Sequence, residues 1–148
     1  MSTVRDLMKK KEGQVPVSVA ADDTVFHALE VMAEKNIGAV LVMEGDRYVG
    51  IFSERDYARK VILQGRESRH TAVKDIMTEK MITVKPETTV EQCMELMTKY
   101  HIRHLPVVAD EHLTGLISIG DVVHSIISEK QSYIENLEEY IHGTSILR

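Results

Sequence analysis

Two serine–aspartate pairs stand where a strand is expected to give way to a helix, in the sequences GIFSERD and GLISIGD. A serine hydroxyl and the amides of a helix N-terminus can bind an anion, and the helix dipole favours phosphate there. A carboxylate three residues later can accept two hydrogen bonds from a ribose diol. These groups suit a nucleotide, although N-cap serines followed by first-turn acids would have the same spacing. The residues are Ser53, Asp56, Ser118 and Asp121.

The two motifs belong to an internal repeat. A shift of 65 residues aligns 17–62 with 82–127 without a gap, and eleven of the 46 aligned positions are identical. A shorter match, VRDLM at 4–8 and VKDIM at 73–77, lies four residues out of step, so the first copy carries an insertion near residues 9–13. Each copy of about 55 residues is too small to bury a good core alone, so we expect the copies to pack as a pseudo-two-fold pair.

Each copy is predicted to fold as β-α-β-β-α, which makes the fold class α+β. Apolar residues at helical spacing mark the first helix, and continuous apolar runs mark the strands. The closing helices begin near Asp56 and Asp121, and Thr88 with Glu91 suggests a capping box before the first helix of the second copy. The predicted strands are 16–19, 38–43 and 48–52 in the first copy, and 81–84, 105–108 and 113–117 in the second.

The last helix continues beyond the second copy. Its apolar residues recur up to Ile141, and Gly143 is the expected stop of a helix of about 20 residues. The apolar stripe of this helix needs a partner surface, either within the chain or in a second subunit. Together with the matching apolar faces of the two copies, this favours a homodimer with its four repeats in a flat disk. The predicted organisation is a first repeat at 1–63, a linker at 64–72, a second repeat at 73–128 and a helical tail at 129–148.

Composition narrows the class of protein. The 148 residues are 43% hydrophobic and 28% charged, as in an ordinary globular domain. A net charge of −5 argues against general nucleic-acid binding. No apolar run is long enough for a membrane helix, and the N-terminal segment does not resemble a signal peptide. We therefore expect a cytoplasmic protein.

Other reactive side chains are interpreted as structural. Cys93 stands on the apolar face of a predicted helix and is assigned to the core, and it excludes an internal disulfide. His101 and His104 lack further ligands in register, so no metal site is expected. His104 is instead expected to line a cleft. The run Lys9–Lys11 is interpreted as a solvated turn.

The duplicated β-α-β-β-α unit, the run His104–Leu105–Pro106–Val107 and the paired G-h-h-S-x-x-D motifs resemble the CBS (cystathionine-β-synthase) domain family. A tandem pair of such domains is called a Bateman module. The resemblance covers residues 4–127 and is strongest to stand-alone CBS pairs. It implies binding of AMP, ADP or ATP, or of NAD(H) or S-adenosylmethionine, in clefts between the copies.

The resemblance also implies roles for individual residues. The two motif aspartates would hold ribose hydroxyls, the two motif serines would meet phosphate, and Ser18 and Thr83 would lie beside the adenine or its ribose. The base would be walled by Ile37, Gly38, Ala39 and Val40 from one copy and by residues 102–106 from the other, including Arg103, His104 and Pro106.

The two sites are not expected to be equal. Arg55 precedes Asp56 and could bind phosphate bidentately, whereas Gly120 precedes Asp121. In the second copy Arg103 and Lys85 would supply that charge. The first copy has Leu41 where the second has Pro106, which changes the shape of its base pocket.

Three functions are compared. The favoured one is a regulatory module that binds an adenosine nucleotide, with AMP as the favoured ligand. It performs no chemistry and passes its ligand state to an unknown partner. A structural dimer adaptor with vestigial sites is the second. A nucleotide hydrolase is the third, and against it the sequence offers no nucleophile–base pair, P-loop or metal cluster.

Overall fold

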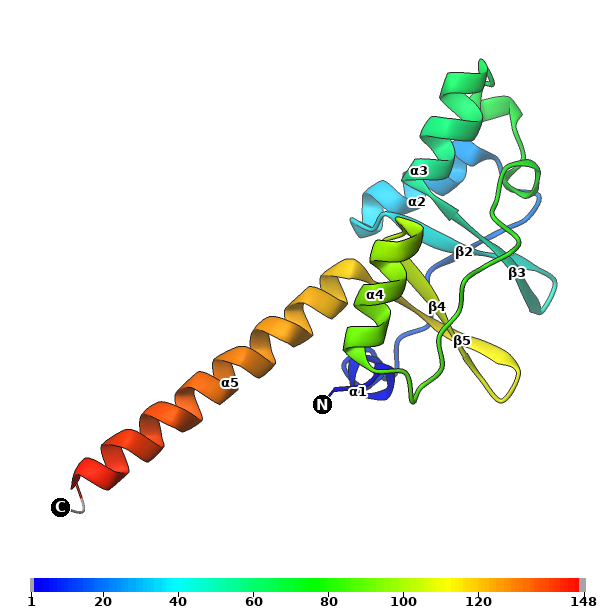
Figure 1. Cartoon of the computed structure of the whole chain (residues 1–148). Coiled ribbons are helices and arrows are strands. Elements are labelled where there is room, and N and C mark those ends of the chain that lie inside the picture. Colours follow the sequence, from blue (N-terminus) through cyan, green and yellow to red (C-terminus); the bar gives the residue numbers. More distant parts are fainter. Residues whose placement is uncertain (1, 147–148) are drawn as a thin grey trace.

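The computed structural model describes residues 2–146 and contains two small sheets, one from each copy (Figure 1). The first sheet has the order β1-β2-β3, with β1 parallel to β2 and β2 antiparallel to β3. The second sheet is the antiparallel pair β4-β5. The strands are β1 (Ser18–Ala20), β2 (Ala39–Glu44), β3 (Arg47–Ser53), β4 (His104–Ala109) and β5 (His112–Ser118).

The strand predicted at 81–84 is reduced to one parallel bridge between Val84 and Val107. In the first copy the Leu41 amide donates to the Val17 carbonyl at 3.1 Å, which helps to pair β1 with β2. The residue that occupies the position of Leu41 in the second copy is Pro106, and proline has no N–H to donate. The corresponding bond cannot form, so the outer strand shortens.

Threonine caps begin the amphipathic helices α2 (Val25–Lys35) and α4 (Val90–Tyr100). In α4 the capping box joins Thr89 and Gln92, so the box predicted for Thr88 and Glu91 is wrong by one residue. The Thr88 hydroxyl instead accepts a hydrogen bond from the Lys85 amide at 3.0 Å.

The closing helices of the two copies differ. After β3 the chain forms a single turn, α3 (Glu54–Asp56), then the π-helical η1 (Tyr57–Val61) and the 3₁₀ turn η2 (Ile62–Gln64). After β5 one continuous helix, α5, runs over Ile119–Ile146. It is longer than predicted and passes through Gly143, so the predicted stop at this glycine is wrong. A glycine in a helix lowers its stability without ending it.

The two copies exchange their first segments. The helix α1 (Val4–Lys9) packs Val4 and Leu7 into the core of the second copy. The turn η4 (Val73–Asp75) and the residue after it pack Val73 and Ile76 into the core of the first copy. A further turn, η3 (Ser68–His70), precedes η4.

Backbone hydrogen bonds fix this exchange in the same way on both sides. The Val4 amide donates to the Thr88 carbonyl, and the Val73 amide donates to the Asp23 carbonyl, each at 2.8 Å. The repeats in the sequence are therefore not the packing units, because each core needs residues from both copies.

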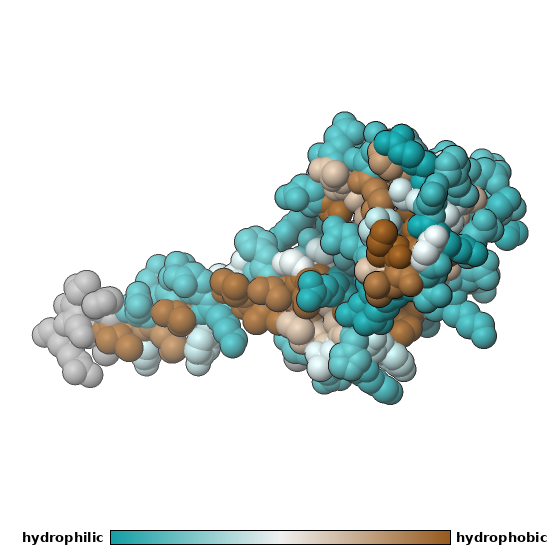
Figure 2. All heavy atoms as spheres, turned by 90° about the horizontal axis from the view of Figure 1, so that it is seen from above, coloured by the Kyte–Doolittle hydropathy of each residue, from teal (hydrophilic) through white to brown (hydrophobic). Residues whose placement is uncertain are grey.

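The tail projects away from both sheets (Figure 1). Apolar side chains remain exposed along this part of α5, as the brown stripe in Figure 2 shows. They include Ile127, Ile134, Leu137 and Ile141. Within the described residues no helix is long and apolar enough to cross a membrane.

Candidate functional site

Two cavities lie between the copies, and each combines the serine–aspartate motif of one copy with the strand entry of the other. The Asp121 cleft has a volume of about 460 Å³ and the Asp56 cleft about 740 Å³. Both sizes suit a small-molecule ligand. The Asp121 cleft is lined by Met8, Lys11, Gln14, Val15, Pro16, Val17, Asn36, Ile37, Gly38, Ala39, His104, Thr114, Gly115, Leu116, Ser118 and Asp121. The Asp56 cleft is lined by Gly38, Ile51, Ser53, Glu54, Arg55, Asp56, Arg59, Thr78, Lys80, Met81, Ile82, Tyr100, Ile102, Arg103, His104, Pro106 and Ile119.

Both motifs are reciprocal N-caps. Each serine hydroxyl accepts a hydrogen bond at 3.2 Å from the amide of its aspartate, and the serine amide donates back to the carboxylate. The capping interpretation is therefore confirmed for both pairs. It is compatible with ligand binding, because the cap holds each carboxylate at the wall of a cleft.

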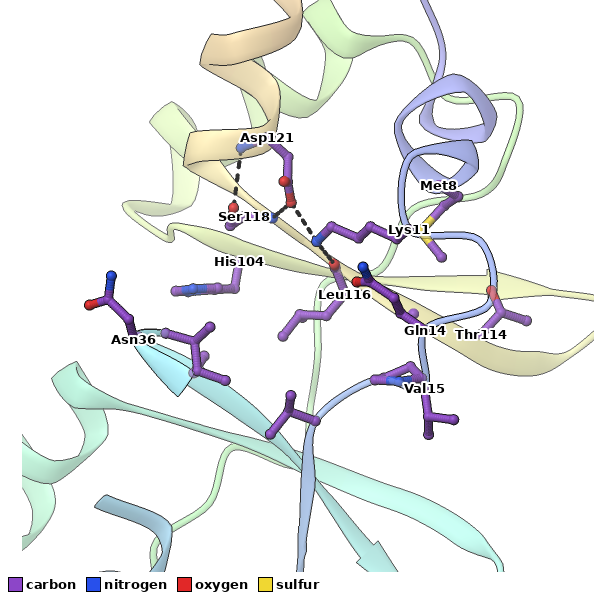
Figure 3. Close-up of a pocket in the computed structure, with 16 residues that line it drawn as sticks. Met8, Lys11, Gln14, Val15, Asn36, His104, Thr114, Leu116, Ser118 and Asp121 are labelled. Atoms are coloured by element: carbon purple, nitrogen blue, oxygen red, sulfur yellow. Dashed lines mark hydrogen bonds and ion pairs between the residues drawn. The ribbon is translucent and has the colours of Figure 1, made fainter. Parts of the chain in front are cut away.

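In the Asp121 cleft the carboxylate is only partly engaged (Figure 3). The Asp121 Oδ2 atom accepts from the Ser118 amide at 2.8 Å and pairs with the Lys11 ammonium at 2.7 Å. The Ser118 hydroxyl also contacts the Asp121 carboxylate. No hydrogen bond or ion pair to the Asp121 Oδ1 atom is found among residues 2–146, so this oxygen can accept a hydrogen bond from a ligand.

The charge state of Asp121 suits that role. Burial raises the pKa of its carboxyl, but the hydrogen bonds and charge of Lys11 and the Ser118 amide outweigh burial, so the pKa lies below its ordinary value. Asp121 is therefore ionised at neutral pH and acts only as an acceptor, as a ribose diol requires.

In the Asp56 cleft the carboxylate is fully engaged. Oδ2 accepts from both the amide and the hydroxyl of Ser53, at 2.9 and 3.1 Å. Oδ1 accepts from the Thr78 hydroxyl and pairs with the Lys60 ammonium, each at 3.1 Å. The Asp56 side chain is 11% exposed, against 27% for Asp121. A ribose must displace existing partners to reach it.

Gly38 and His104 line both clefts, so they form a wall that the two cavities share. A Cβ added to Gly38 would lie 3.3 Å from the His104 ring, which shows how closely the backbone and the imidazole pack. Burial lowers the pKa of His104; Asp121 opposes this, and Lys11 and Arg103 reinforce it. The imidazole is therefore uncharged at neutral pH.

Most of the predicted site residues line one cleft or the other, but four do not. Val17 and Ile82 face the clefts, and side chains alternate along extended chain, so Ser18 and Thr83 point elsewhere. Val40 is fully buried in the core of the first copy, and Lys85 is exposed outside both clefts.

Arg103 lines a different cleft from the one expected. It lies with Asp56, not with Ser118, because the strand entry of each copy faces the motif of the other. Arg55 lies in the same cleft, where its guanidinium donates to the His101 carbonyl. The cation beside Asp121 is instead Lys11.

The interpretation of Lys9–Lys11 as a solvated turn is wrong for Lys11. Its ammonium donates to the Leu116 carbonyl at 3.0 Å and pairs with Asp121. The signal that could have identified it is the insertion near residues 9–13, which has no counterpart after VKDIM. An insertion beside a site motif changes what reaches that motif.

The assignment of Cys93 to the core is confirmed. Cys93 is buried in the core of the second copy, and burial raises the pKa of its thiol to about 11, so it is a poor nucleophile. Among residues 2–146 no cluster of histidine, cysteine, aspartate or glutamate could hold a metal ion.

This arrangement of two exchanged β-α-β-β-α units with paired clefts defines a class, the CBS pair. The family model for the CBS domain matches residues 4–62 and 73–128, and the chain belongs to this family, with two CBS domains in tandem. It is 45% identical to a mitochondrial CBS domain-containing protein of Arabidopsis thaliana, over 96% of this chain and 73% of that protein.

Two solved structures extend the comparison. A protein with CBS domains from Burkholderia ambifaria is 49% identical and superposes with a TM-score of 0.82, over 86% of this chain and 95% of the other. A CBS domain protein of Pyrobaculum aerophilum, in complex with AMP, is 26% identical with a TM-score of 0.68, over 80% of this chain and 88% of the other. This chain is a CBS-pair regulatory module.

Proposed function

We propose that this protein is a sensor that binds an adenosine nucleotide between its CBS repeats and performs no chemistry itself. AMP is the favoured ligand. The observation that carries the proposal is the Asp121 cleft. It presents a free carboxylate oxygen and a serine hydroxyl beside an ammonium group and an apolar wall. The AMP complex of the Pyrobaculum aerophilum protein supports the choice of ligand class.

Ligand binding would draw the two copies together, because each cleft has walls from both. A ligand that binds one arrangement of the copies better than another shifts the population toward it, and this shift is the signal. NAD(H) and S-adenosylmethionine remain the alternative ligands, and the dimer adaptor with vestigial sites remains the alternative function.

Isothermal titration calorimetry with AMP, ATP, NADH and S-adenosylmethionine tests the proposal. We expect the parent to bind AMP and the Asp56→Ala/Asp121→Ala double variant to lose most of that binding. Asp46→Ala, an exposed turn residue outside both clefts, is the control. If no adenosine compound binds the parent, the sensor proposal fails and the adaptor is favoured. Stoichiometric conversion of a nucleotide would instead indicate an enzyme.

We also propose that the protein is a homodimer whose subunits associate through α5. Exposed isoleucines and a leucine of α5 recur at positions 127, 134, 137 and 141. This spacing, of seven and of three and four residues, suits a helix–helix interface. Truncation after Ser128 should lower the molar mass measured by light scattering toward that of a monomer. A full-length monomer, or a truncated chain that stays dimeric, would contradict this assignment.

A further inference from the structure

The two clefts differ strongly in charge. The Asp56 cleft contains four cationic side chains and two carboxylates, whereas the Asp121 cleft contains one of each, Lys11 and Asp121. The cations of the Asp56 cleft are Arg55, Arg59, Lys80 and Arg103. A cleft lined mainly by one sign of charge concentrates the field and attracts ions of the opposite sign.

The positive charge of the Asp56 cleft is largely uncompensated within the protein. Asp56 is already paired with Lys60, a fifth cation outside the lining, so Glu54 is the remaining acid. Within residues 2–146, none of the four lining cations forms an ion pair with a carboxylate. Arg55 donates to a backbone carbonyl, which leaves its charge in place.

The Asp121 cleft is balanced instead. Lys11 and Asp121 neutralise each other at 2.7 Å, and His104 is uncharged because its pKa is lowered. One phosphate group can share the Lys11 ammonium, but every further phosphate would enter without a counter-charge. The volumes differ in the same sense, at about 460 Å³ for this cleft and about 740 Å³ for the other.

We infer that the two clefts divide adenosine ligands by the number of their phosphates. The Asp56 cleft takes the di- or triphosphate, held chiefly by its cations because its carboxylate is engaged. The Asp121 cleft takes the monophosphate, held by its free carboxylate oxygen and the single cation Lys11. The inference rests on the proposed function, since it presumes that both clefts bind adenosine compounds.

Calorimetry with AMP and with ATP in the presence of EDTA tests the division. For Lys80→Gln/Arg103→Gln we expect ATP affinity to fall about tenfold or more, because two charge-assisted contacts are lost, while AMP affinity changes less than about twofold. For Lys11→Gln we expect the reverse, with AMP affinity reduced and ATP affinity retained. Higher salt should weaken ATP binding more than AMP binding.

Arg47→Gln/Arg66→Gln is the matched control, because it removes the same net charge from exposed positions outside both clefts. Equal losses for both nucleotides in either cleft variant would overturn the inference, as would an ATP loss in the control equal to that of Lys80→Gln/Arg103→Gln. A parent that binds neither nucleotide would instead overturn the proposed function. Circular dichroism of each variant confirms that it is folded.

Discussion

The Asp56 and Asp121 clefts come from the same repeated motif, but their carboxylates differ in availability. Both oxygens of Asp56 are bound by neighbouring side chains or backbone, whereas the Oδ1 atom of Asp121 is open to a ligand. At the Asp56 cleft, Thr78 of the second copy pairs its backbone with Ile51 on β3 of the first copy and also donates its hydroxyl to Asp56. In the second copy, the Leu116 carbonyl on β5 receives the Lys11 ammonium, and Asp121 shares that ammonium. The backbone pairing of Thr78 with β3 at the Asp56 cleft thus has its counterpart, at the Asp121 cleft, in the contact of the Lys11 side chain with β5.

The insertion near residues 9–13 accounts for the difference. The exchanged segments end alike, because Met77 packs on Gly50 and Met8 packs on Gly115. After Met77 the chain pairs directly with β3 through Thr78. After Met8 the chain instead passes β5 through the extra residues of the insertion. The duplication therefore explains why the two clefts share a backbone arrangement. The short insertion explains why a lysine side chain contacts Asp121 where a threonine on a paired segment contacts Asp56.

The largest expected effect concerns the two motif glycines. A Cβ at Gly50 would lie 2.9 Å from the Thr78 carbonyl oxygen, which the backbone pairing fixes, and 2.8 Å from the Met77 sulfur. A Cβ at Gly115 would meet only the end of the Met8 side chain, which can rotate away. We expect Gly50→Ala to lower the free energy of unfolding by about 3 kcal/mol and Gly115→Ala by about 1 kcal/mol.

Urea denaturation followed by circular dichroism measures both glycine variants. The key result is that Gly50→Ala should lose more unfolding free energy than Gly115→Ala, whatever the absolute size of each loss. Equal losses would show that the backbone of residues 77–78 moves as readily as the Met8 side chain.

The next effect separates stability from binding at the two aspartates. Asp56→Ala removes four hydrogen-bonded or ionic contacts of a side chain that is 11% exposed. We expect it to lower the free energy of unfolding by about 2 kcal/mol. Asp121→Ala removes fewer contacts and should cost about 1 kcal/mol, but it should weaken AMP binding more than Asp56→Ala does.

Thermal denaturation and AMP titration of the two single variants give this comparison. Asp46→Ala again serves as the exposed control. If Asp121→Ala were the more destabilising of the two and left AMP binding intact, the carboxylate described as open would have a purely structural role.

The smallest effect concerns the shared wall. Because the pKa of His104 is lowered in the folded protein, the unfolded chain takes up a proton more readily below its ordinary pKa of about 6.5. The stability that depends on the uncharged imidazole is therefore fully present above that pH and is lost as the pH falls from there toward the lower pKa of the folded protein. The pKa of Asp121 lies below its ordinary value, so this carboxylate stays ionised across the window.

We expect His104→Gln to lose up to about 1 kcal/mol less stability than the parent between pH 7.5 and 5.5, since glutamine does not titrate. Urea denaturation at both pH values measures the difference. Identical losses in the two proteins would show that the titration of His104 does not account for the acid sensitivity.

The repeat and its motifs predicted much of the site because they depend on local chemistry. A serine before a helix with an aspartate three residues later forms a cap wherever the chain turns, and both caps are present. The apolar runs likewise predicted β2, β3, β4 and β5 to within a residue or two. The site residues Ser18, Thr83 and Lys85 were harder to place, since which way a side chain faces depends on the pairing of the strand.

The sequence by itself determined the duplication, the α+β class, the CBS resemblance and the two serine–aspartate caps, because each is written in residue types at short spacing. Only the tertiary structure decided that α1 and η4 exchange between the cores, that each cleft joins the motif of one copy to the strand entry of the other, and that Lys11 reaches Asp121. These facts depend on contacts between segments far apart in the chain. Such contacts are set by the packing of two incomplete cores, which no local pattern records.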